Sequence, residues 1–431
     1  MGRFLLISLS LATGLAAVYP GASAWAQAST GLQAGSGDLS LKGAEKLWLE
    51  KNRELQQARI AVKAAEADRV TANEAPNPQL TLSSTSLNPR TGIGGGSLRE
   101  KRADSVIRID QQIERGGKRE LRTKTAGALV QAAREDLQES LRQGRMQLVS
   151  AYWDLRQAQE RLSLAQDTAE LYHRTIRATE LRLKVGDVAA ADLARLKVEA
   201  ARADNDARGA VSDLAQAQSA LAYQLGREIR AADLVATDPW PALNGGEASP
   251  TAQSQALDQR PDVRAAQARV EAAEHARDLA RANRSRDISV GVQFEHFPEP
   301  DQSANNTYGV SVSVPLFLRH SYEGEIARAE ADLEQAREAL DQVRGQAQTD
   351  LAQAASQLAS ARERRQRLEG GLLQDAERAA KAAEFAYTKG ASSLVDLLDA
   401  RRTLKAVQLD GVGLRADYAK ALAAWEAAQG K

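Results

Sequence analysis

The side chains that could bind a metal ion are few and scattered along the sequence. The sequence contains no cysteine, and Met146 is the only methionine after the first residue. Soft metal ions are held by thiolates, thioethers or clustered imidazoles, so no tight soft-metal site is predicted. His296 lies beside Glu295 and near Glu299, which could give weak metal binding, but a loop histidine without a ligand is the favoured interpretation. The other histidines stand far apart, at His173, His275 and His320.

No group of residues has the pattern of a catalytic centre. A nucleophile, a base and an orienting group do not occur at a recognisable spacing. The glycine run from Gly92 to Gly96 does not follow a strand into a helix, as a phosphate-binding loop would, and its composition indicates a flexible loop. Lysine plus arginine and aspartate plus glutamate each number 57, so no basic field would attract nucleic acid. We therefore expect neither an enzyme nor a nucleic-acid-binding protein, and no cofactor.

The start of the chain has the features of a secretory signal. Arg3 precedes an apolar run, and Ala24-Trp25-Ala26 fits the small-x-small pattern of a signal peptidase site. We predict a signal peptide over residues 1–26, cleaved near Ala26. No later stretch approaches the roughly 20 apolar residues of a transmembrane helix. The mature chain is expected to stay soluble outside the cytoplasm or to enter a membrane as β-strands. Without cysteine it is not expected to be a lipoprotein.

Long helices are expected to dominate the mature chain. Proline, which is hardly tolerated inside a helix, is absent between Pro89 and Pro239 and after Pro315. From about Lys118 to Lys184 the pattern is helical and would form a rod of roughly 100 Å. Only 4% of residues are aromatic, which is typical of coiled coils. Apolar residues also recur every seven positions, as in the a/d seam of a coiled coil. They are Ile326, Leu333 and Leu340, with Ala329, Ala336 and Val343 three positions after them.

The sequence also repeats itself, which indicates an internal duplication. At an offset of 208, Leu55, Val62, Ala64, Ala65, Glu66, Arg69 and Leu80 match Val263, Val270, Ala272, Ala273, Glu274, Arg277 and Ile288. At an offset of 204, Glu180, Gly186, Asp192, Leu193, Asp213 and Ala220 match Glu384, Gly390, Asp396, Leu397, Asp417 and Ala424. We predict a first repeat over 27–237, a Pro- and Gly-rich linker over 238–254, and a second repeat over 255–431.

Four segments alternate between apolar and polar residues and predict β-strands. They lie at about 79–87, 105–114, 287–295 and 307–317. Their length suits a tilted crossing of a bilayer, and alternation is what a lipid-facing barrel around water requires. Because four strands are too few to close a barrel, three copies are expected to supply twelve. The predicted fold class is therefore mainly α with a small β part, with long antiparallel coiled-coil helices forming an α-barrel.

Several strings resemble a known family. The duplicated plan is similar to the TolC-type outer membrane efflux proteins over nearly the whole mature chain, from about Leu41 to Ala428. Three strings resemble the heavy-metal subgroup of cobalt-zinc-cadmium type channels: Gln112-Ile113-Glu114-Arg115-Gly116-Gly117-Lys118-Arg119, Arg260-Pro261-Asp262-Val263-Arg264-Ala265-Ala266 and Val312-Ser313-Val314-Pro315-Leu316. The resemblance implies a homotrimer in outer membrane lipid, with a large periplasmic part. It also implies docking to a periplasmic adaptor (a membrane fusion protein) and to an inner membrane resistance-nodulation-division pump, whose substrates the channel exports passively.

The resemblance further implies roles for particular residues. Acidic residues after the glycine turn between the last two helices help to close the family's periplasmic entrance, so Asp396 and Asp399 are candidate gate residues. Their counterpart Asp192 would share that role. Three chains would bring six carboxylates to one axis and favour cations there. A helix-start or solvated residue is the competing interpretation of Asp396, and Ser392 replaces the arginine of the family's usual salt-bridge lock.

Two sets of glycines are predicted to shape the chain. Gly186 and Gly390 are expected at positive φ in tight turns. The adaptor is then expected to grip the two tips, with Val185, Gly186, Asp187, Lys389, Gly390 and Ala391 as candidate contacts. The pair Gly116 and Gly117 is expected to form a strand-to-helix corner. The following Lys118 and Arg119 oppose the helix dipole, and lipid head groups or a neighbouring subunit's acids could offset this, or the pair could simply be exposed.

Two other classes of protein also fit parts of the pattern. A periplasmic adaptor offers coiled-coil hairpins, but it flanks a single hairpin with small β-domains, whereas here paired strands recur between long helices. A soluble filamentous scaffold would leave the strand alternation without a purpose. A detergent-extracted, heat-resistant oligomer would distinguish a channel from both alternatives. The substrate is not specified by the sequence, and heavy-metal cations are favoured over drugs only by resemblance.

Overall fold

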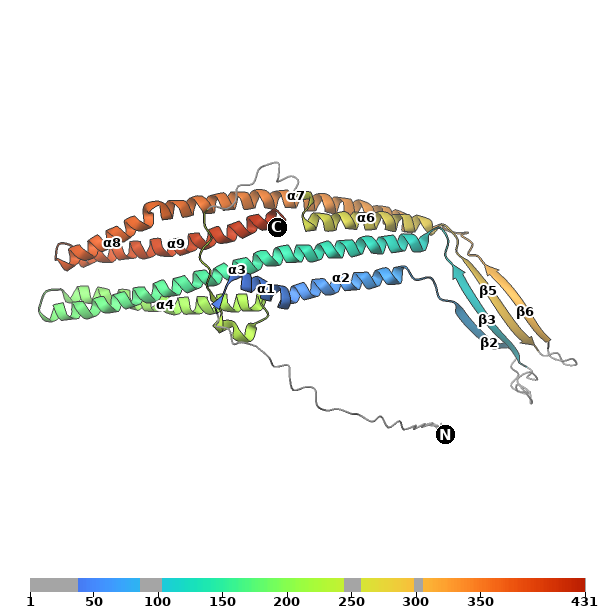
Figure 1. Cartoon of the computed structure of the whole chain (residues 1–431), viewed down its shortest axis with the longest axis horizontal. Coiled ribbons are helices and arrows are strands. Elements are labelled where there is room, and N and C mark those ends of the chain that lie inside the picture. The colour runs from blue at the N-terminus through green and yellow to red at the C-terminus, as the bar shows by residue number, and fades with distance from the viewer. Residues whose placement is uncertain (1–37, 86–102, 244–256, 298–304, 431) are drawn as a thin grey trace, which may run out of the picture.

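The structure is a computed structural model that describes residues 38–85, 103–243, 257–297 and 305–430. These residues form a long rod of helices with a small sheet leaning from one end (Figure 1). The predicted signal peptide (1–26), the Gly92–Gly96 loop and Glu299 lie outside the described residues, as does the predicted linker beyond residue 243. Among the described helices, none is both long enough and apolar enough to cross a membrane.

Helices make up most of the described chain, as the sequence predicted. α3 has 67 residues and coincides with the segment expected to form a rod of roughly 100 Å. The helices are α1 (Leu41–Lys51), α2 (Arg53–Ala72), α3 (Lys118–Lys184), α4 (Ala190–Gln224), α6 (Pro261–Ala282), α7 (Glu323–Arg367), α8 (Leu373–Thr388) and α9 (Leu394–Ala428). A 3-10 turn, η2 (Glu228–Asp233), and a π turn, η3 (Leu368–Leu372), complete the helical part.

The turn η3 interrupts the last long helical stretch, which the proline pattern did not indicate. It separates α7 from α8 and contains Gly370 and Gly371, of which Gly371 leaves the helical conformation. Consecutive glycines lower helix propensity by about 1 kcal/mol each relative to alanine. The break therefore falls where the backbone is least committed to a regular helix.

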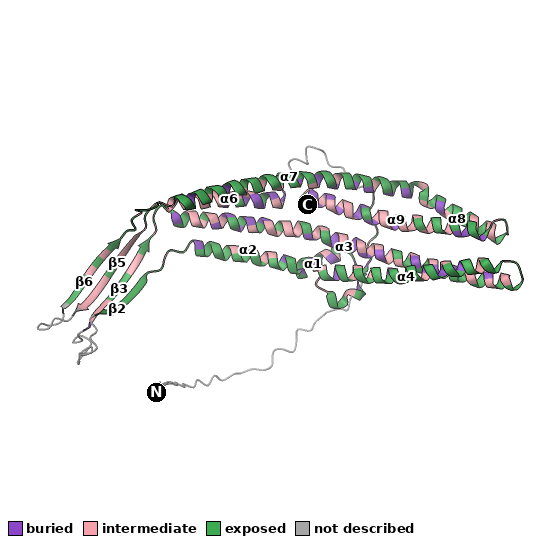
Figure 2. Ribbon diagram, turned by 180° about the vertical axis from the view of Figure 1, so that it is seen from behind, coloured by how far each residue is buried: buried purple, intermediate pink, exposed green. Residues whose placement is uncertain are grey.

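The helices pack side by side in a fixed lateral order. α2 and α4 follow one another along one side of α3, and α6 and α9 follow one another along its other side. α7 and α8 then pack on α6 and α9. Buried residues concentrate on the faces that the helices turn toward one another (Figure 2). The outer edges of this layer are therefore α2 with α4 on one side and α7 with α8 on the other.

The sheet contains four antiparallel strands, β2 (Gln79–Thr85), β3 (Asp104–Ile113), β5 (Ile288–Phe297) and β6 (Asn305–Ser313), in the order β2-β3-β5-β6. They lie close to the predicted ranges. β2 has seven residues rather than the expected nine, and the chain beyond Thr85 lies outside the described residues. Within the described residues, β2 and β6 each pair on one side only, so the sheet has two open edges.

The register divides the sheet into an apolar face and a polar face. Side chains that pair across strands lie on the same face. One row across the sheet consists of Leu80, Ile109, Val292 and Val310, and the next consists of Leu82, Ile107, Phe294 and Tyr308. Apolar residues in these rows are exposed: Tyr308 is 84% and Val310 is 78% exposed. The row between these two lies on the opposite, polar face of the sheet. It consists of Thr81, Arg108, Gln293 and Gly309.

A compact core near the middle of the rod joins elements that the sequence analysis did not predict. The short strands β1 (Asp38–Leu39) and β4 (Val235–Ala236) pair in parallel. Buried Tyr152 of α3 holds them, because its hydroxyl donates to the Leu39 carbonyl (3.0 Å) and accepts from the Asp238 amide (3.0 Å). Burial raises the pKa of the Tyr152 hydroxyl, so the neutral donor form is maintained.

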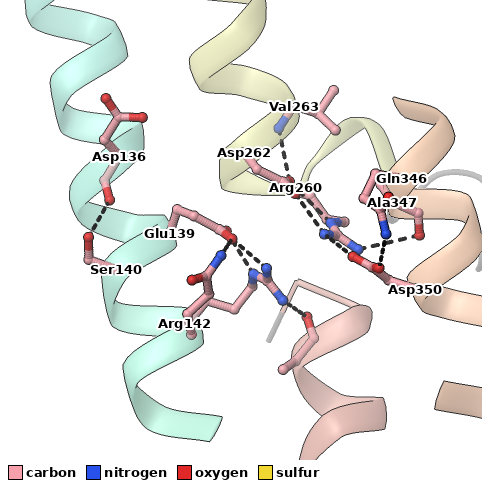
Figure 3. Close-up of polar contacts among 12 residues, drawn as sticks. Asp136, Glu139, Ser140, Arg142, Arg260, Asp262, Val263, Gln346, Ala347 and Asp350 are labelled. Atoms are coloured by element: carbon pink, nitrogen blue, oxygen red, sulfur yellow. Dashed lines mark hydrogen bonds and ion pairs between the residues drawn. The ribbon is translucent and has the colours of Figure 1, made fainter. Parts of the chain in front are cut away.

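Arg260 anchors the start of α6 to α7, as Figure 3 shows. Its side chain is only 1% exposed. The guanidinium contacts Asp262 through Nη2 to Oδ2 (2.6 Å) and Nε to Oδ1 (3.1 Å), and it reaches Asp350 at 3.2 Å. It also donates to the carbonyl of Ala347. The string around Arg260 that resembled the heavy-metal subgroup therefore forms a structural clamp between two helices.

Replacing this arginine should destabilise the protein strongly. We expect Arg260→Leu to lower the free energy of unfolding by about 3 kcal/mol, because one partner of a buried ion pair is removed. Arg328→Leu is the matched control, since Arg328 forms an exposed pair with Asp332 on α7 whose loss should cost about 0.5 kcal/mol or less. Urea unfolding followed by circular dichroism would measure both, and equal losses would contradict the assignment.

Candidate functional site

The end of the rod away from the sheet carries two helical turns, between α3 and α4 and between α8 and α9 (Figure 1). Gly186 and Gly390 occupy them at φ of 79° and 73°, a conformation that glycine adopts without steric cost. In each turn the next amide bonds to a carbonyl five residues back, Asp187 to Arg182 and Ala391 to Ala386. This pattern closes helix C-termini.

The residues predicted to contact an adaptor all lie in these two turns. Val185 is 80% exposed, which suits a contact residue. The carboxylate of Asp187 accepts from Nε of Arg182 at 2.6 Å, and the ammonium of Lys389 lies 5.7 Å from the ring centre of Phe385. The turns are therefore ordered by their own side chains. Docking of an adaptor here stays a prediction.

Arg182 and Tyr387 join the two turns, a contact that the sequence analysis missed. The guanidinium carbon of Arg182 lies 5.4 Å from the ring centre of Tyr387, within range of a cation-π interaction. Below this contact, a buried cluster that includes Tyr172, Leu196 and Leu397 unites the two hairpins. The partners are far apart in the chain, so no local pattern could have identified them. The two tips are held together as one unit.

The candidate gate residue Asp396 helps to start α9. Its carboxylate accepts from the amide (3.0 Å) and hydroxyl (2.8 Å) of Ser393, and the Ser393 Oγ accepts from the Asp396 amide (3.2 Å). This reciprocal cap satisfies amides of the first turn. The Ser393 hydroxyl and amide lower the pKa of the Asp396 carboxyl. The cap is therefore complete at neutral pH and is lost as the pH falls through that lowered pKa.

Asp396 and Asp399 line one hollow between α4 and α9, but Asp192 is not part of its lining. Asp192 lies in the first turn of α4, with a carboxylate oxygen 3.7 Å from Arg195. The hydrogen bond to the Glu199 carboxylate (2.6 Å) raises the pKa of Arg402 most, and the Asp399 carboxylate adds a small further increase. The charged lining of the hollow consists of Arg195, Glu199, Arg202, Asp396, Asp399 and Arg402. The lining thus contains three acids and three arginines. Two of these arginines, Arg202 and Arg402, pair with Glu199.

The strand-to-helix corner contains Gly116 and Gly117 at φ of 74° and 71°. A Cβ on Gly116 would lie 2.6 Å from the Ser285 side chain, so glycine is required for space as well as for conformation. Gly117 occupies the N-cap position of α3. The glycine pair thus turns the chain sharply between β3 and α3.

The basic residues after this corner are partnered within the chain, which corrects the sequence interpretation. Lys118 is buried, and its ammonium contacts Asp287 at 2.8 Å. Asp287 also accepts from the Arg115 amide (3.0 Å). Arg119 donates through Nε to Asn73 (3.2 Å). The penalty of Lys118 at a helix N-terminus is thus offset by Asp287, an acid of the same chain that precedes β5.

The described residues offer no group of three or more metal-ligating side chains. His296, the candidate for weak metal binding, contacts Oδ1 of Asn306 on the neighbouring strand through Nδ1 at 2.9 Å. Glu299 lies outside the described part of the chain. His296 thus forms a cross-strand contact at the end of the sheet.

The fold and sequence define the class of protein. The chain matches the family described as "Outer membrane efflux protein" over residues 46–227 and 252–431. It therefore belongs to this family of outer membrane efflux channels, which are transporters rather than enzymes. The family predicted from sequence is confirmed, and membership replaces the adaptor and scaffold alternatives.

Individual relatives support the same placement. The chain is 25% identical over 388 residues to the cobalt-zinc-cadmium resistance protein CzcC of Cupriavidus metallidurans, which covers 88% of this chain and 87% of that one. It is 26% identical over 381 residues to SilC of Salmonella typhimurium, described as a probable outer membrane lipoprotein, covering 84% and 79%. A crystal structure of CusC has the same fold, with a TM-score of 0.72 at 19% identity over 90% and 92% of the chains.

Removing charge from the hollow tests the gate assignment. Asparagine in place of both Asp396 and Asp399 retains cap acceptors and removes two carboxylates per chain. We expect Asp396→Asn/Asp399→Asn to raise single-channel conductance in planar bilayers and to weaken block by polyvalent cations. Asp375→Asn is the control, since Asp375 forms an exposed pair with Arg378 on α8. Conductance and block equal to those of the control would remove the gate assignment.

Proposed function

We propose that three copies of this chain form the passive outer membrane duct of a tripartite efflux system. The observation that carries the proposal is the open sheet at the end of the rod. β2 and β6 leave one backbone edge each unpaired within the described residues, while one face carries exposed rows of apolar side chains. In lipid such edges must be paired, because unsatisfied backbone groups cost several kcal/mol each.

The strand directions are compatible with closure of the sheet by further copies. Each neighbouring pair in the order β2-β3-β5-β6 is antiparallel. β6 of one copy would therefore run antiparallel to β2 of the next, without any change of direction. Three copies would give the twelve strands expected from the sequence, and their helical layers would join between the α7–α8 edge and the α2–α4 edge as an α-barrel. The two family matches, one in each half, support the duplicated plan behind this arrangement.

The long rod would carry the duct into the periplasm. α3 extends roughly 100 Å from the sheet to the tips, and the tips are joined by Arg182 and Tyr387. We propose that these tips meet a periplasmic adaptor, which links them to an inner membrane resistance-nodulation-division pump. Asp396 and Asp399 would regulate entry at this end. The predicted cleavage near Ala26 would release the mature chain for assembly.

Heavy-metal cations are the proposed substrates. The similarity to the cobalt-zinc-cadmium resistance protein extends over most of both chains. A duct, however, passes what its pump loads, so drugs or other small molecules are the alternative substrates.

Engineered cysteines can test the closed assembly, since the sequence contains no cysteine. Thr81 on β2 and Ser313 on β6 lie on opposite outer strands of the sheet. Three strand spacings separate them by about 14 Å, too far for a disulfide within one chain. We expect Thr81→Cys combined in turn with Thr307→Cys, Ser311→Cys or Ser313→Cys to give covalent dimers and trimers on oxidation, measured by non-reducing electrophoresis of outer membranes.

The controls use each cysteine alone, which should leave the chain monomeric on the same gel. The three β6 positions sample different registers against β2. Monomer from every combination, or the protein recovered as a free periplasmic monomer, would contradict the proposed trimer.

A deletion strain tests the substrate class. We expect loss of this chain to increase sensitivity to cobalt, zinc or cadmium more than to nickel, copper, silver or a panel of hydrophobic drugs. Minimum inhibitory concentrations with and without a plasmid copy would measure the effect. Sensitivity confined to the drugs would overturn the metal assignment while leaving the channel proposal intact.

A further inference from the structure

The polar face of the sheet contains one tightly ordered charge cluster. Arg108 contacts Asp110 through Nε to Oδ2 and Nη2 to Oδ1, both at 2.7 Å. Nη2 also donates to Oγ of Ser311 on β6 at 3.0 Å. Two hydrogen bonds in this parallel arrangement form the strongest kind of guanidinium–carboxylate contact. The cluster thus occupies both oxygens of the Asp110 carboxylate.

β5, the strand between β3 and β6, makes room for this cluster. Gly291 on β5 pairs with both Asp110 and Ser311 in the register. A Cβ on Gly291 would lie 2.2 Å from Oδ1 of Asp110 and 2.6 Å from Oγ of Ser311. Any larger residue would displace one of these side chains. The glycine therefore fits the geometry of the pair, although its own backbone conformation does not require glycine.

The charges on this face are unequal. In β3, Asp104 and Asp110 alternate on the same face as Arg108, and Glu295 of β5 pairs with Val106 on that face. Among the described strand residues Arg108 is the only lysine or arginine. The described strands of each chain thus contribute three carboxylates and one guanidinium to the polar face. In a barrel this face lines the water-filled interior.

We propose that Arg108 is a tethered counter-ion that keeps the barrel interior from trapping metal cations at Asp110. The inference rests on the proposed barrel and adds a residue that sets how cations pass through it. A duct for cations must attract them, yet it must bind them weakly enough to release them. Glu295 provides attraction, whereas Arg108 occupies the carboxylate of Asp110. With the Ser311 hydroxyl, that carboxylate would otherwise offer oxygen ligands to a divalent ion.

Single substitutions of the two partners should have opposite effects. In planar bilayers with a KCl gradient, we expect Arg108→Gln to shift the reversal potential toward greater cation preference. Block by Cd²⁺ should then occur at about tenfold lower concentration, because a charged cleft concentrates counter-ions by that order or more. Asp110→Asn should shift the reversal potential toward anions, since the guanidinium is left unpaired. The double variant Arg108→Gln/Asp110→Asn should stay close to the wild type.

A charge change elsewhere is the matched control. Arg230→Gln removes an exposed arginine of η2, in the helical part of the molecule, and should alter neither the reversal potential nor Cd²⁺ block. Reversal potentials that do not change in Arg108→Gln and Asp110→Asn, or that shift in the same direction in both, would overturn the inference. A wild-type protein that forms no channel would instead count against the proposed function, so the two failures are distinguishable.

Discussion

The need to pair backbone groups at the sheet edges is the constraint on which the rest of the molecule depends. An apolar face made of residues such as Val310 and Tyr308 favours lipid, and lipid supplies no hydrogen bonds to an open strand. Water would satisfy the edges but not the apolar rows. Only an environment that buries the rows and supplies strands to both edges satisfies the two requirements together. In the proposed assembly, further copies of the same chain would supply such strands in the correct direction.

The helical rod connects the sheet to the tips, so the orientation of the sheet affects the position of the far end of the molecule. Because α3 continues directly from the Gly116–Gly117 corner, the orientation of the sheet fixes the direction of the rod. The pair formed by Lys118 and Asp287 fastens that corner to the start of β5, so both hairpins of the sheet move with the helices. At the other end, Arg182 and Tyr387 hold the two tips together. The orientation of the sheet therefore determines where the tips lie.

Local patterns predicted those parts of the fold in which neighbouring residues determine the structure. Period two identified the strands, and the proline-free stretch identified α3 with its observed bounds. The positive φ of Gly186 and Gly390 also followed from residue type and spacing. By contrast, Lys118 and Asp287 are 169 residues apart, and no local pattern pairs them. The strands β1 and β4 have two residues each, too few to show a period, and depend on Tyr152 from a distant helix.

Ion pairing between acids and arginines recurs along the molecule and agrees with passive transport. At the tips Asp187 pairs with Arg182, in the hollow Glu199 pairs with Arg402, and in the sheet Asp110 pairs with Arg108. A binding protein for metal cations would leave such carboxylates converging and free, since oxygen ligands must face the ion. Here each acid has a guanidinium within 2.6 to 2.7 Å. In the proposed tripartite system, substrate selection would then lie with the pump that loads the duct.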